Sequence, residues 1–469
     1  MRPFWLIWLL ATVAAGIVLA GGMVFGGPTR TSHVIGRTSD GHHQIELACT
    51  ACHSTPFAGA DAIQTACVGC HGVDLTSAKD SHPAKKFDDP RNADRLTRLE
   101  ARRCVTCHTE HRPAITSAMG VTLPGDFCAL CHKDVGKERP SHKNLAFSTC
   151  ASAGCHNYHD NRALYEDFLE KHATKPELLA KPVLKLRAAP PQREAVAKAI
   201  SDLTAADAPE TKRGHGTNDA DWMASAHARG GVNCSGCHTP RAKDNSAPTA
   251  WIEQPDHTVC AGCHKDQAAG FVAGRHGMRL AAGLLASQDG PFGLVRRAPL
   301  TPMRPDLARL PMAERSHAAS LTCTSCHGAH AFVTANAEVD ACLGCHADSH
   351  SLAYRYSPHG RLWQDERSGR IPNGSGVSCA TCHMPRENRE DPDTGEDRLV
   401  VAHNQNANLR PNEKMIRSVC MNCHGLGFAL DALADRALVE RNFAGRPSVR
   451  VESIDWVMSR KKEREGRSK

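Results

Sequence analysis

The chain contains ten copies of one short motif, in which two cysteines are separated by two residues and followed directly by a histidine. Together the copies use 20 of the 22 cysteines. The two thiols can form thioethers with the two vinyl groups on one edge of a porphyrin, and the adjacent imidazole then ligates the iron. The motif therefore predicts covalently attached c-type haem, with the histidine as its proximal ligand.

The ten motifs are spread from residue 49 to residue 424. Their cysteines are Cys49, Cys52, Cys67, Cys70, Cys104, Cys107, Cys128, Cys131, Cys234, Cys237, Cys260, Cys263, Cys323, Cys326, Cys342, Cys345, Cys379, Cys382, Cys420 and Cys423. Their histidines are His53, His71, His108, His132, His238, His264, His327, His346, His383 and His424. Disulfides or zinc ribbons would leave the histidine after every pair unexplained, and a zinc ribbon also needs its pairs to meet two by two.

The two remaining cysteines, Cys150 and Cys155, are separated by four residues and precede His156. His159 follows three residues later, the same spacing as in the "CHTEH" segment that ends at His111. We interpret this longer motif as an eleventh haem site with two additional residues between the thioethers. A local disulfide between the two thiols is the alternative.

Eleven proximal histidines leave 28 − 11 = 17 others, so the chain has enough histidines for bis-histidine ligation throughout. His111 and His159 lie too close to the proximal histidine before them to bind the same iron from the opposite side. We therefore expect each to reach a neighbouring haem. The predicted sixth ligands are His82, His111, His142, His159, His172, His227, His276, His317, His359 and His403.

Aromatic residues make up only 5% of the 469 residues, which is few for a chain that must build a large core from side chains. Eleven haems correspond to about one porphyrin per 43 residues (469/11). This density predicts a haem-packed core and porphyrins that touch or nearly touch. Because strand signals are weak throughout and glycine, proline and short polar turns are frequent, we expect a mainly α fold with extensive irregular loops.

The N-terminus carries no charged residue from Phe4 to Phe25, between Arg2 and Arg30. This length suits a helix that spans a bilayer, and it exceeds the usual apolar region of a signal peptide. We favour an uncleaved anchor over a cleaved signal peptide. The expected location is the periplasm, with the protein anchored to the inner membrane, or secreted to the periplasm if the leader is cleaved.

The formal net charge of +7 is calculated from the side chains alone and does not include the charges of bound haem. Haem propionates would offset it, and many lysines and arginines are expected to pair with them. We therefore predict no nucleic-acid partner. The basic tail Ser459–Lys469 is expected to be a solvated helix end or a frayed terminus.

The motifs form two groups, which predict five domains or segments. These are an anchor or signal peptide at 1–30, a five-haem module at 31–175, a linker with helical parts at 176–215, a six-haem module at 216–445 and a basic tail at 446–469. Helices are expected at Asn161–His172, Arg193–Ala206 and Gly427–Phe443.

The exported part resembles the multihaem c-type cytochromes. The first group of motifs looks like the serial-haem modules of cytochrome c3-like and pentahaem electron carriers. In the second group, "SHAASLTCTSCHGAH", "SPHGRLW" and "VCMNCHGLGFAL" are similar to the later part of the hydroxylamine oxidoreductase and octahaem cytochrome superfamily. That resemblance implies bis-histidine haems. It does not extend to the catalytic features, since no tyrosine follows the last motif and no motif ends in lysine.

The haem motifs and the family resemblance are compatible with two main functions. We assign no catalytic residue. The first is electron transfer through a chain of haems to or from redox proteins or a membrane quinol-linked complex. The alternative is an oxidoreductase that acts on hydroxylamine or on small nitrogen or sulfur oxyanions at one open-faced haem. A filament subunit is a third class.

Overall fold

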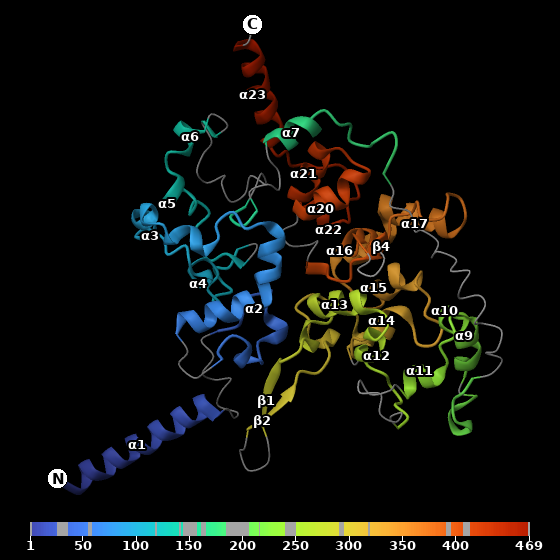
Figure 1. Cartoon of the computed structure of the whole chain (residues 1–469), viewed down its shortest axis with the longest axis horizontal. Coiled ribbons are helices and arrows are strands. Elements are labelled where there is room, and N and C mark those ends of the chain that lie inside the picture. Colours follow the sequence, from blue (N-terminus) through green and yellow to red (C-terminus); the bar gives the residue numbers. More distant parts are fainter. Residues whose placement is uncertain are drawn as a thin grey trace. The chain divides into compact units, whose positions relative to one another are not determined.

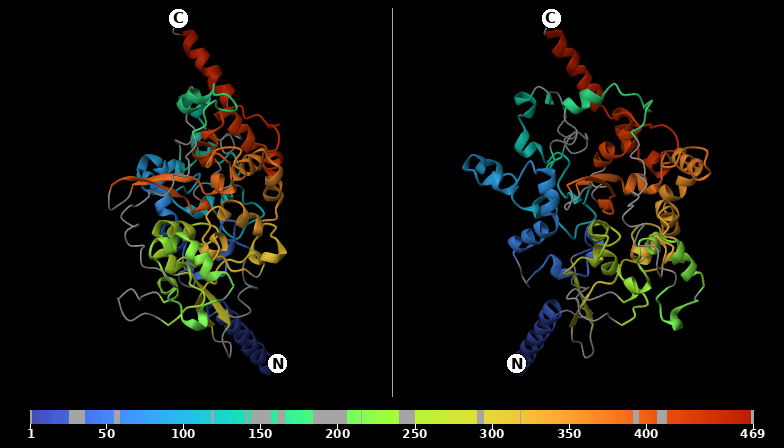
Figure 2. Two further views of the ribbon diagram at one scale, coloured as in Figure 1. Left: turned by 90° about the vertical axis from the view of Figure 1, so that its right-hand side faces the viewer. Right: turned by 45° about the vertical axis from the view of Figure 1, so that its right-hand side comes forward.

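The structure is a computed structural model. It describes residues 2–25, 36–54, 59–117, 120–139, 142–143, 157–160, 166–183, 206–214, 216–239, 250–289, 295–317, 319–390, 395–406 and 413–467. The chain divides into two compact units. The first contains residues 1–169, 279–301 and 455–469, and the second contains residues 170–278 and 302–454. Short helices joined by long irregular segments make up both units (Figures 1 and 2).

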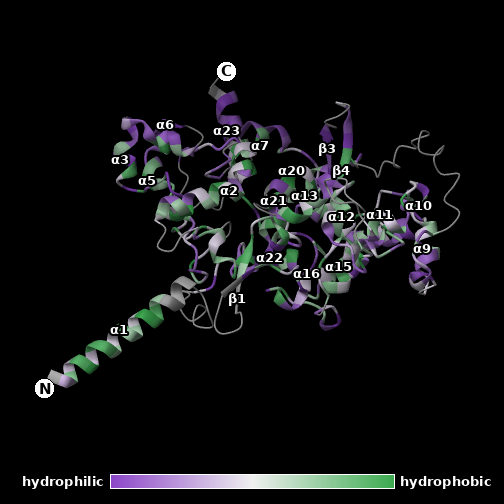
Figure 3. Cartoon of the chain, turned by 60° about the horizontal axis from the view of Figure 1, so that its bottom comes forward, coloured by the Kyte–Doolittle hydropathy of each residue, from purple (hydrophilic) through white to green (hydrophobic). Residues whose placement is uncertain are grey.

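The chain begins with the long helix α1 (Arg2–Phe25). Its segment Pro3–Ala20 is apolar and long enough to cross a membrane, and none of it is buried within the structure. Figure 3 shows green, hydrophobic residues alternating with pale ones along much of this helix. A signal sequence near the N-terminus can meet the same criteria of length and composition, so the helix is consistent with either role.

The remainder of the first unit is built mostly from one-turn helices. Among the described residues of the haem-motif region, the longest helix is α2 (Ala60–Ala78), which contains the whole second motif. The short helices are α3 (Ala93–Leu96), α4 (Cys104–Cys107), α5 (Ala129–His132) and α6 (Val135–Glu138). The antiparallel hairpin of β1 (Leu285–Asp289) and β2 (Val295–Pro299) also belongs to this unit, with Leu285 paired to Pro299.

The hairpin follows the first motif by more than two hundred residues in the sequence, yet it packs against the residue that precedes this motif. Ala286 and Leu300 form a small buried cluster with Ala48, the residue before Cys49. Arg279 stabilises the same region, because its guanidinium donates to the carbonyls of Gln44 (2.7 Å) and Thr301 (2.8 Å). The first unit therefore differs in extent from a module made only of residues 31–175.

The second unit contains the later motifs on short helices. These helices are α9 (Asn218–Ala224), α10 (Ala226–Arg229), α11 (Cys234–His238), α12 (His257–Ala261), α13 (Lys265–Ala273), α14 (Cys323–His327), α15 (Asp340–Cys345), α16 (Ser349–Ala353), α17 (Pro358–Arg367), α18 (Cys379–His383), α20 (Glu413–Ser418), α21 (Leu426–Ala434) and α22 (Arg436–Glu440). A second antiparallel hairpin pairs β3 (Arg386–Glu390) with β4 (Asp397–Val401).

The described residues test the expected helices only in part. Helix α7 (Glu166–His172) agrees with the second half of the helix expected at Asn161–His172, and residues 161–165 lie outside the described part. The expected helix at Arg193–Ala206 lies almost entirely outside it. The single helix expected at Gly427–Phe443 is wrong, because Asp435 adopts an extended conformation between α21 and α22. Its carboxylate accepts from the amide of Leu438 and so begins a new helix.

The basic tail forms helix α23 (Ser453–Arg467), as its composition predicts. Among the described residues of the second unit, one buried apolar cluster contains Val339, Leu343, Tyr354 and Trp363.

Candidate haem-binding sites

Most of the described motifs form about one turn of helix, and the second motif lies within the longer helix α2. The amide of the histidine donates to the carbonyl of the first cysteine, at 2.8 Å for His108, His264, His346 and His424. Residues three and four apart lie on the same side of a helical turn. The two thiols and the imidazole of a motif therefore share one face, as attachment to one porphyrin requires.

Side-chain caps begin several of these turns at the first cysteine. The side chain of Asn233 accepts from the amide of Cys234 at 2.8 Å. Ser378 and Thr381 form a reciprocal capping box around Cys379. Since an N-terminal cap satisfies amides that have no partner within the helix, these residues explain why such short helices form.

Extended segments from elsewhere in the same unit bind the end of several motifs. The amide of Ile252 donates to the carbonyl of His238 (2.7 Å), that of Ala313 to Cys345 (2.8 Å) and that of Leu179 to Cys423 (2.8 Å). Each bond fixes the backbone next to a proximal histidine, so the loops between motifs also orient the ligand.

Successive motifs lie next to one another within each unit. The thiols of Cys67 and Cys104 lie close enough to interact, and this interaction raises the pKa of Cys67 and lowers that of Cys104 to about 6. The same relationship joins Cys260 to Cys323, and it lowers the pKa of Cys260 to about 7. A third thiol pair joins Cys342 to Cys379 and raises the pKa of Cys342. Each contact connects one motif to the next in the sequence.

Nine motif histidines each face a second histidine ring, and the ring centres are 5.9–6.3 Å apart. The pairs are His71 with His42, His132 with His82, His108 with His159, His264 with His227, His238 with His330, His346 with His276, His327 with His403, His383 with His350, and His424 with His359.

This spacing fits an iron atom between the two rings. Metal–imidazole bonds are about 2 Å long, and a ring nitrogen lies about 1 Å from the ring centre, so two coaxial ligands have centres roughly 6 Å apart. Within the described part of the chain, no group of three or more His, Cys, Asp or Glu side chains could hold a bare metal ion. The paired rings are thus suited to a porphyrin-bound iron, whose four equatorial ligands come from the macrocycle.

The Nδ1 atoms of many of these rings bind carbonyl oxygens. Nδ1 of His82 binds the carbonyl of Tyr158 (2.6 Å), and that of His238 binds the carbonyl of Ile252 (2.6 Å). The rings of His108, His350, His403 and His424 make equivalent bonds. A carbonyl can only accept, so Nδ1 carries the proton and Nε2 keeps a lone pair for a metal.

Burial holds several of these imidazoles in the neutral form. It lowers the pKa of His276, His359 and His383 to about 4 in each case, with a smaller contribution from the neighbouring histidine. Neutral imidazole is the form that ligates metals. These rings are therefore ready to bind iron at neutral pH.

Six of the ten predicted sixth ligands face a motif histidine in this way. They are His82, His159, His227, His276, His359 and His403. The other four, His111, His142, His172 and His317, are not members of the nine described pairs. Cys150, Cys155 and His156 lie outside the described residues, so the structure gives no geometry for the long motif.

Sequence reasoning did not select His42, His330 and His350 as ligands. A signal existed for His330, since "CHGAH" has the same spacing as the segments that end at His111 and His159. His330 and His111 also share a left-handed backbone conformation, with φ of 64° and 63°. No comparable pattern marks His42 or His350.

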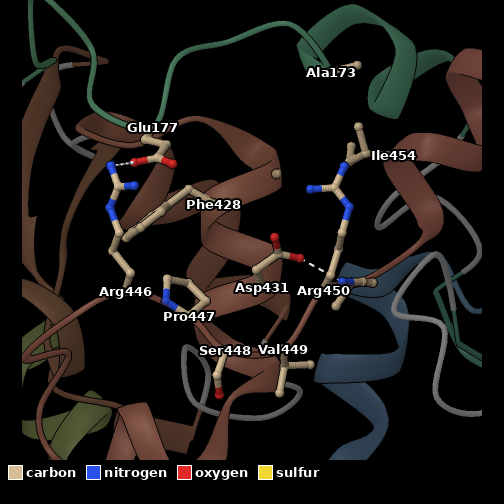
Figure 4. A pocket seen from close by; sticks show the side chains of 12 residues that line it. Ala173, Glu177, Phe428, Asp431, Arg446, Pro447, Ser448, Val449, Arg450 and Ile454 are labelled. Atoms are coloured by element: carbon tan, nitrogen blue, oxygen red, sulfur yellow. Dashed lines mark hydrogen bonds and ion pairs between the residues drawn. The ribbon is translucent and has the colours of Figure 1, made fainter.

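A cavity of about 450 Å³ lies beside the last motif, behind the ring of Phe428 (Figure 4). Phe428 stacks on His424 with ring centres 4.9 Å apart. On the cavity wall, Glu177 pairs with Arg446 at 2.9 Å, and the carbonyl of Glu177 binds Nδ1 of His424 at 3.0 Å. The ion pair thus supports the segment that orients this proximal histidine.

The helical fold, the repeated motifs and the facing histidines are the features expected of a protein that binds several haems c. Residues 41–133 match the family described as cytochrome c3, and this segment contains the first four motifs. The match supports a multihaem c-type cytochrome module with covalent haem, and it indicates electron transfer. No curated protein and no solved structure matches the chain.

Proposed function

We propose that the chain is a membrane-anchored periplasmic electron-transfer protein that binds eleven haems c through bis-histidine ligation. The observation that carries this proposal is the set of nine facing histidine pairs at one common separation. When bound, the haems supply one-electron carriers between which electrons can tunnel. The protein's contribution is to attach, ligate and space them.

The contacts between successive motifs support a continuous path within each unit. In the second unit, thiols of neighbouring motifs contact each other from Cys260 to Cys323 and from Cys342 to Cys379. Cys326 lies close enough to Cys342 for the two to interact electrostatically. Such spacing brings consecutive porphyrin edges together, which suits electron tunnelling along the chain order.

For the first haem we propose His111 as the sixth ligand. Burial raises the pKa of the Cys52 thiol in the first motif, and the nearby carboxylate of Glu110, the residue before His111, raises it further. The backbone of His111 matches that of His330, which faces the proximal histidine of a motif other than its own. Nδ1 of His111 binds the carbonyl of Gly36 at 2.9 Å, which leaves Nε2 for a metal.

Intact mass measurement of the mature protein tests the number of haems. Eleven haems are expected, and ten haems with a disulfide between Cys150 and Cys155 would contradict the reading of the long motif. Mass also shows whether α1 is retained as an anchor or removed. Fractionation of the host cells then shows whether the haem-loaded protein is bound to the inner membrane on its periplasmic side.

Optical and EPR spectra test the function. Bis-histidine ligation predicts low-spin haem in both oxidation states and no binding of carbon monoxide to the reduced protein. A high-spin signal or carbon monoxide binding in the unmodified protein would instead favour an open-faced haem and an oxidoreductase.

A further inference from the structure

One short segment of the first unit serves several predicted haems. His108 is the proximal histidine of the third motif, and its ring faces His159. Two residues later, Glu110 contacts His42, whose ring faces His71 of the second motif. Glu110 therefore lies between the second and third predicted haem sites. It is not needed to attach either haem, so it must have another role.

The carboxylate of Glu110 is held by three hydrogen bonds. Its Oε1 accepts from Nδ1 of His42 (2.6 Å) and from the hydroxyl of Ser39 (2.8 Å), and its Oε2 accepts from the amide of Ser39 (2.7 Å). Ser39 is buried, with 7% of its surface exposed. The side chains of His42 and Glu110 are 34% and 30% exposed, so the pair is only partly screened by water.

This arrangement differs from that of most other paired rings. His82, His108, His238, His350, His403 and His424 bind neutral backbone carbonyls through Nδ1. His42 binds a carboxylate instead, at a shorter distance than the 3.2 Å between His159 and Asp80. A charged acceptor makes a stronger hydrogen bond and gives the imidazole more anionic character.

We infer that Glu110 sets the redox potential of the second haem by making His42 an electron-rich sixth ligand. The oxidised iron carries one more positive charge than the reduced iron, so an anion bonded to its ligand favours the oxidised form. The second haem is thereby held at a lower potential than it would have with a carbonyl acceptor. This inference rests on the proposed function, because it takes His42 as a ligand.

Glu110→Gln in the full-length, haem-loaded protein tests the inference. Glutamine keeps one oxygen, which can accept from His42 and from the Ser39 hydroxyl as Oε1 does. It therefore removes the charge and the bond from the Ser39 amide but retains the acceptor that faces the ring. Redox titration followed by optical and EPR spectra should show one low-spin haem whose reduction equilibrium constant has risen at least tenfold, about 59 mV for one electron. Haem content should stay unchanged.

Glu100→Gln is the matched control, since it removes the same charge from a carboxylate that binds Arg102. Equal shifts in both variants would mean a general charge effect and would overturn the inference. Unchanged redox potentials in Glu110→Gln would also overturn the inference. Loss of haem or a high-spin signal in this variant would overturn it as well, because either result would assign Glu110 a purely structural role. Failure of the proposed function is distinguishable, because it would appear as missing or high-spin haem in the unmodified protein.

Discussion

The imidazole rings of His238 and His330 face each other with their centres 6.1 Å apart and their planes 16° from parallel. His330 follows His327 by only three residues, yet the ring of His327 faces His403. The second histidine of a Cys-His-x-x-His segment thus serves a motif other than its own. The same holds for His159, whose ring faces His108.

Replacing His330 should open the sixth position of one haem. His330→Ala removes the ring opposite His238, so we expect one haem in the protein to become high-spin and to bind carbon monoxide when reduced. The matched control is His317→Ala. His317 was predicted as a ligand from the sequence, but the six motif histidines of the second unit already face other rings. A high-spin haem in His317→Ala, or none in His330→Ala, would contradict the structural assignment.

The angles between paired rings predict the EPR spectrum of the oxidised protein. The angle between two axial imidazole planes controls the g-anisotropy of low-spin ferric haem, which is moderate for near-parallel planes and extreme for near-perpendicular ones. The angles are 18° for His108 with His159 and 88° for His264 with His227. We therefore expect both kinds of signal in one spectrum. His330→Ala should remove intensity from the first kind alone, and His227→Ala from the second.

Gly274, at the C-terminal end of α13, packs closely against His403, whose ring faces His327. A Cβ atom at Gly274 would lie 2.8 Å from the carbonyl oxygen of His403 and 2.5 Å from the side chain of Gln405. Because backbone cannot yield as a flexible side chain can, Gly274→Ala should displace His403 and cost about 1–3 kcal/mol of stability. We expect a lower melting temperature and a partly high-spin haem. Gly125→Ala is the control, since its Cβ would meet no atom within 4 Å, and an equal loss there would refute the steric argument.

The sequence predicts the attachment residues better than the sixth ligands, for a physical reason. Thioether attachment is local, so two thiols and a histidine must lie on one helical turn and their spacing is visible in the chain. A sixth ligand need only approach in space. His350 lies four residues after His346 but faces His383, and His42 faces His71 from a separate turn. The packing of the hairpin on Ala48 could not be predicted from the sequence either, because the two segments are more than two hundred residues apart.

Asp435 should make the region after the last motif sensitive to acid. Its carboxylate accepts from the amide of Leu438 and from the amide and hydroxyl of Ser448, and these bonds lower its pKa to about 2. A carboxyl group whose pKa is lower in the folded protein stabilises the fold at pH values above its pKa in the unfolded chain, about 3.9. This contribution is lost as the pH falls toward 2. The carboxylate caps α22, whose Val439 carbonyl binds Nδ1 of His350 at 2.5 Å.

Asp435→Asn tests this linkage by thermal unfolding across pH. The variant should be less stable than the unmodified protein at pH 7, because a neutral amide accepts more weakly than a carboxylate. The difference between the two melting temperatures should shrink between pH 4 and pH 2, where Asp435 itself becomes protonated. Asp455→Asn, a change in the first turn of α23, is a control for loss of one charge near the C-terminus. A difference for Asp435→Asn that persists undiminished at pH 2 would show that its carboxylate charge does not stabilise this segment.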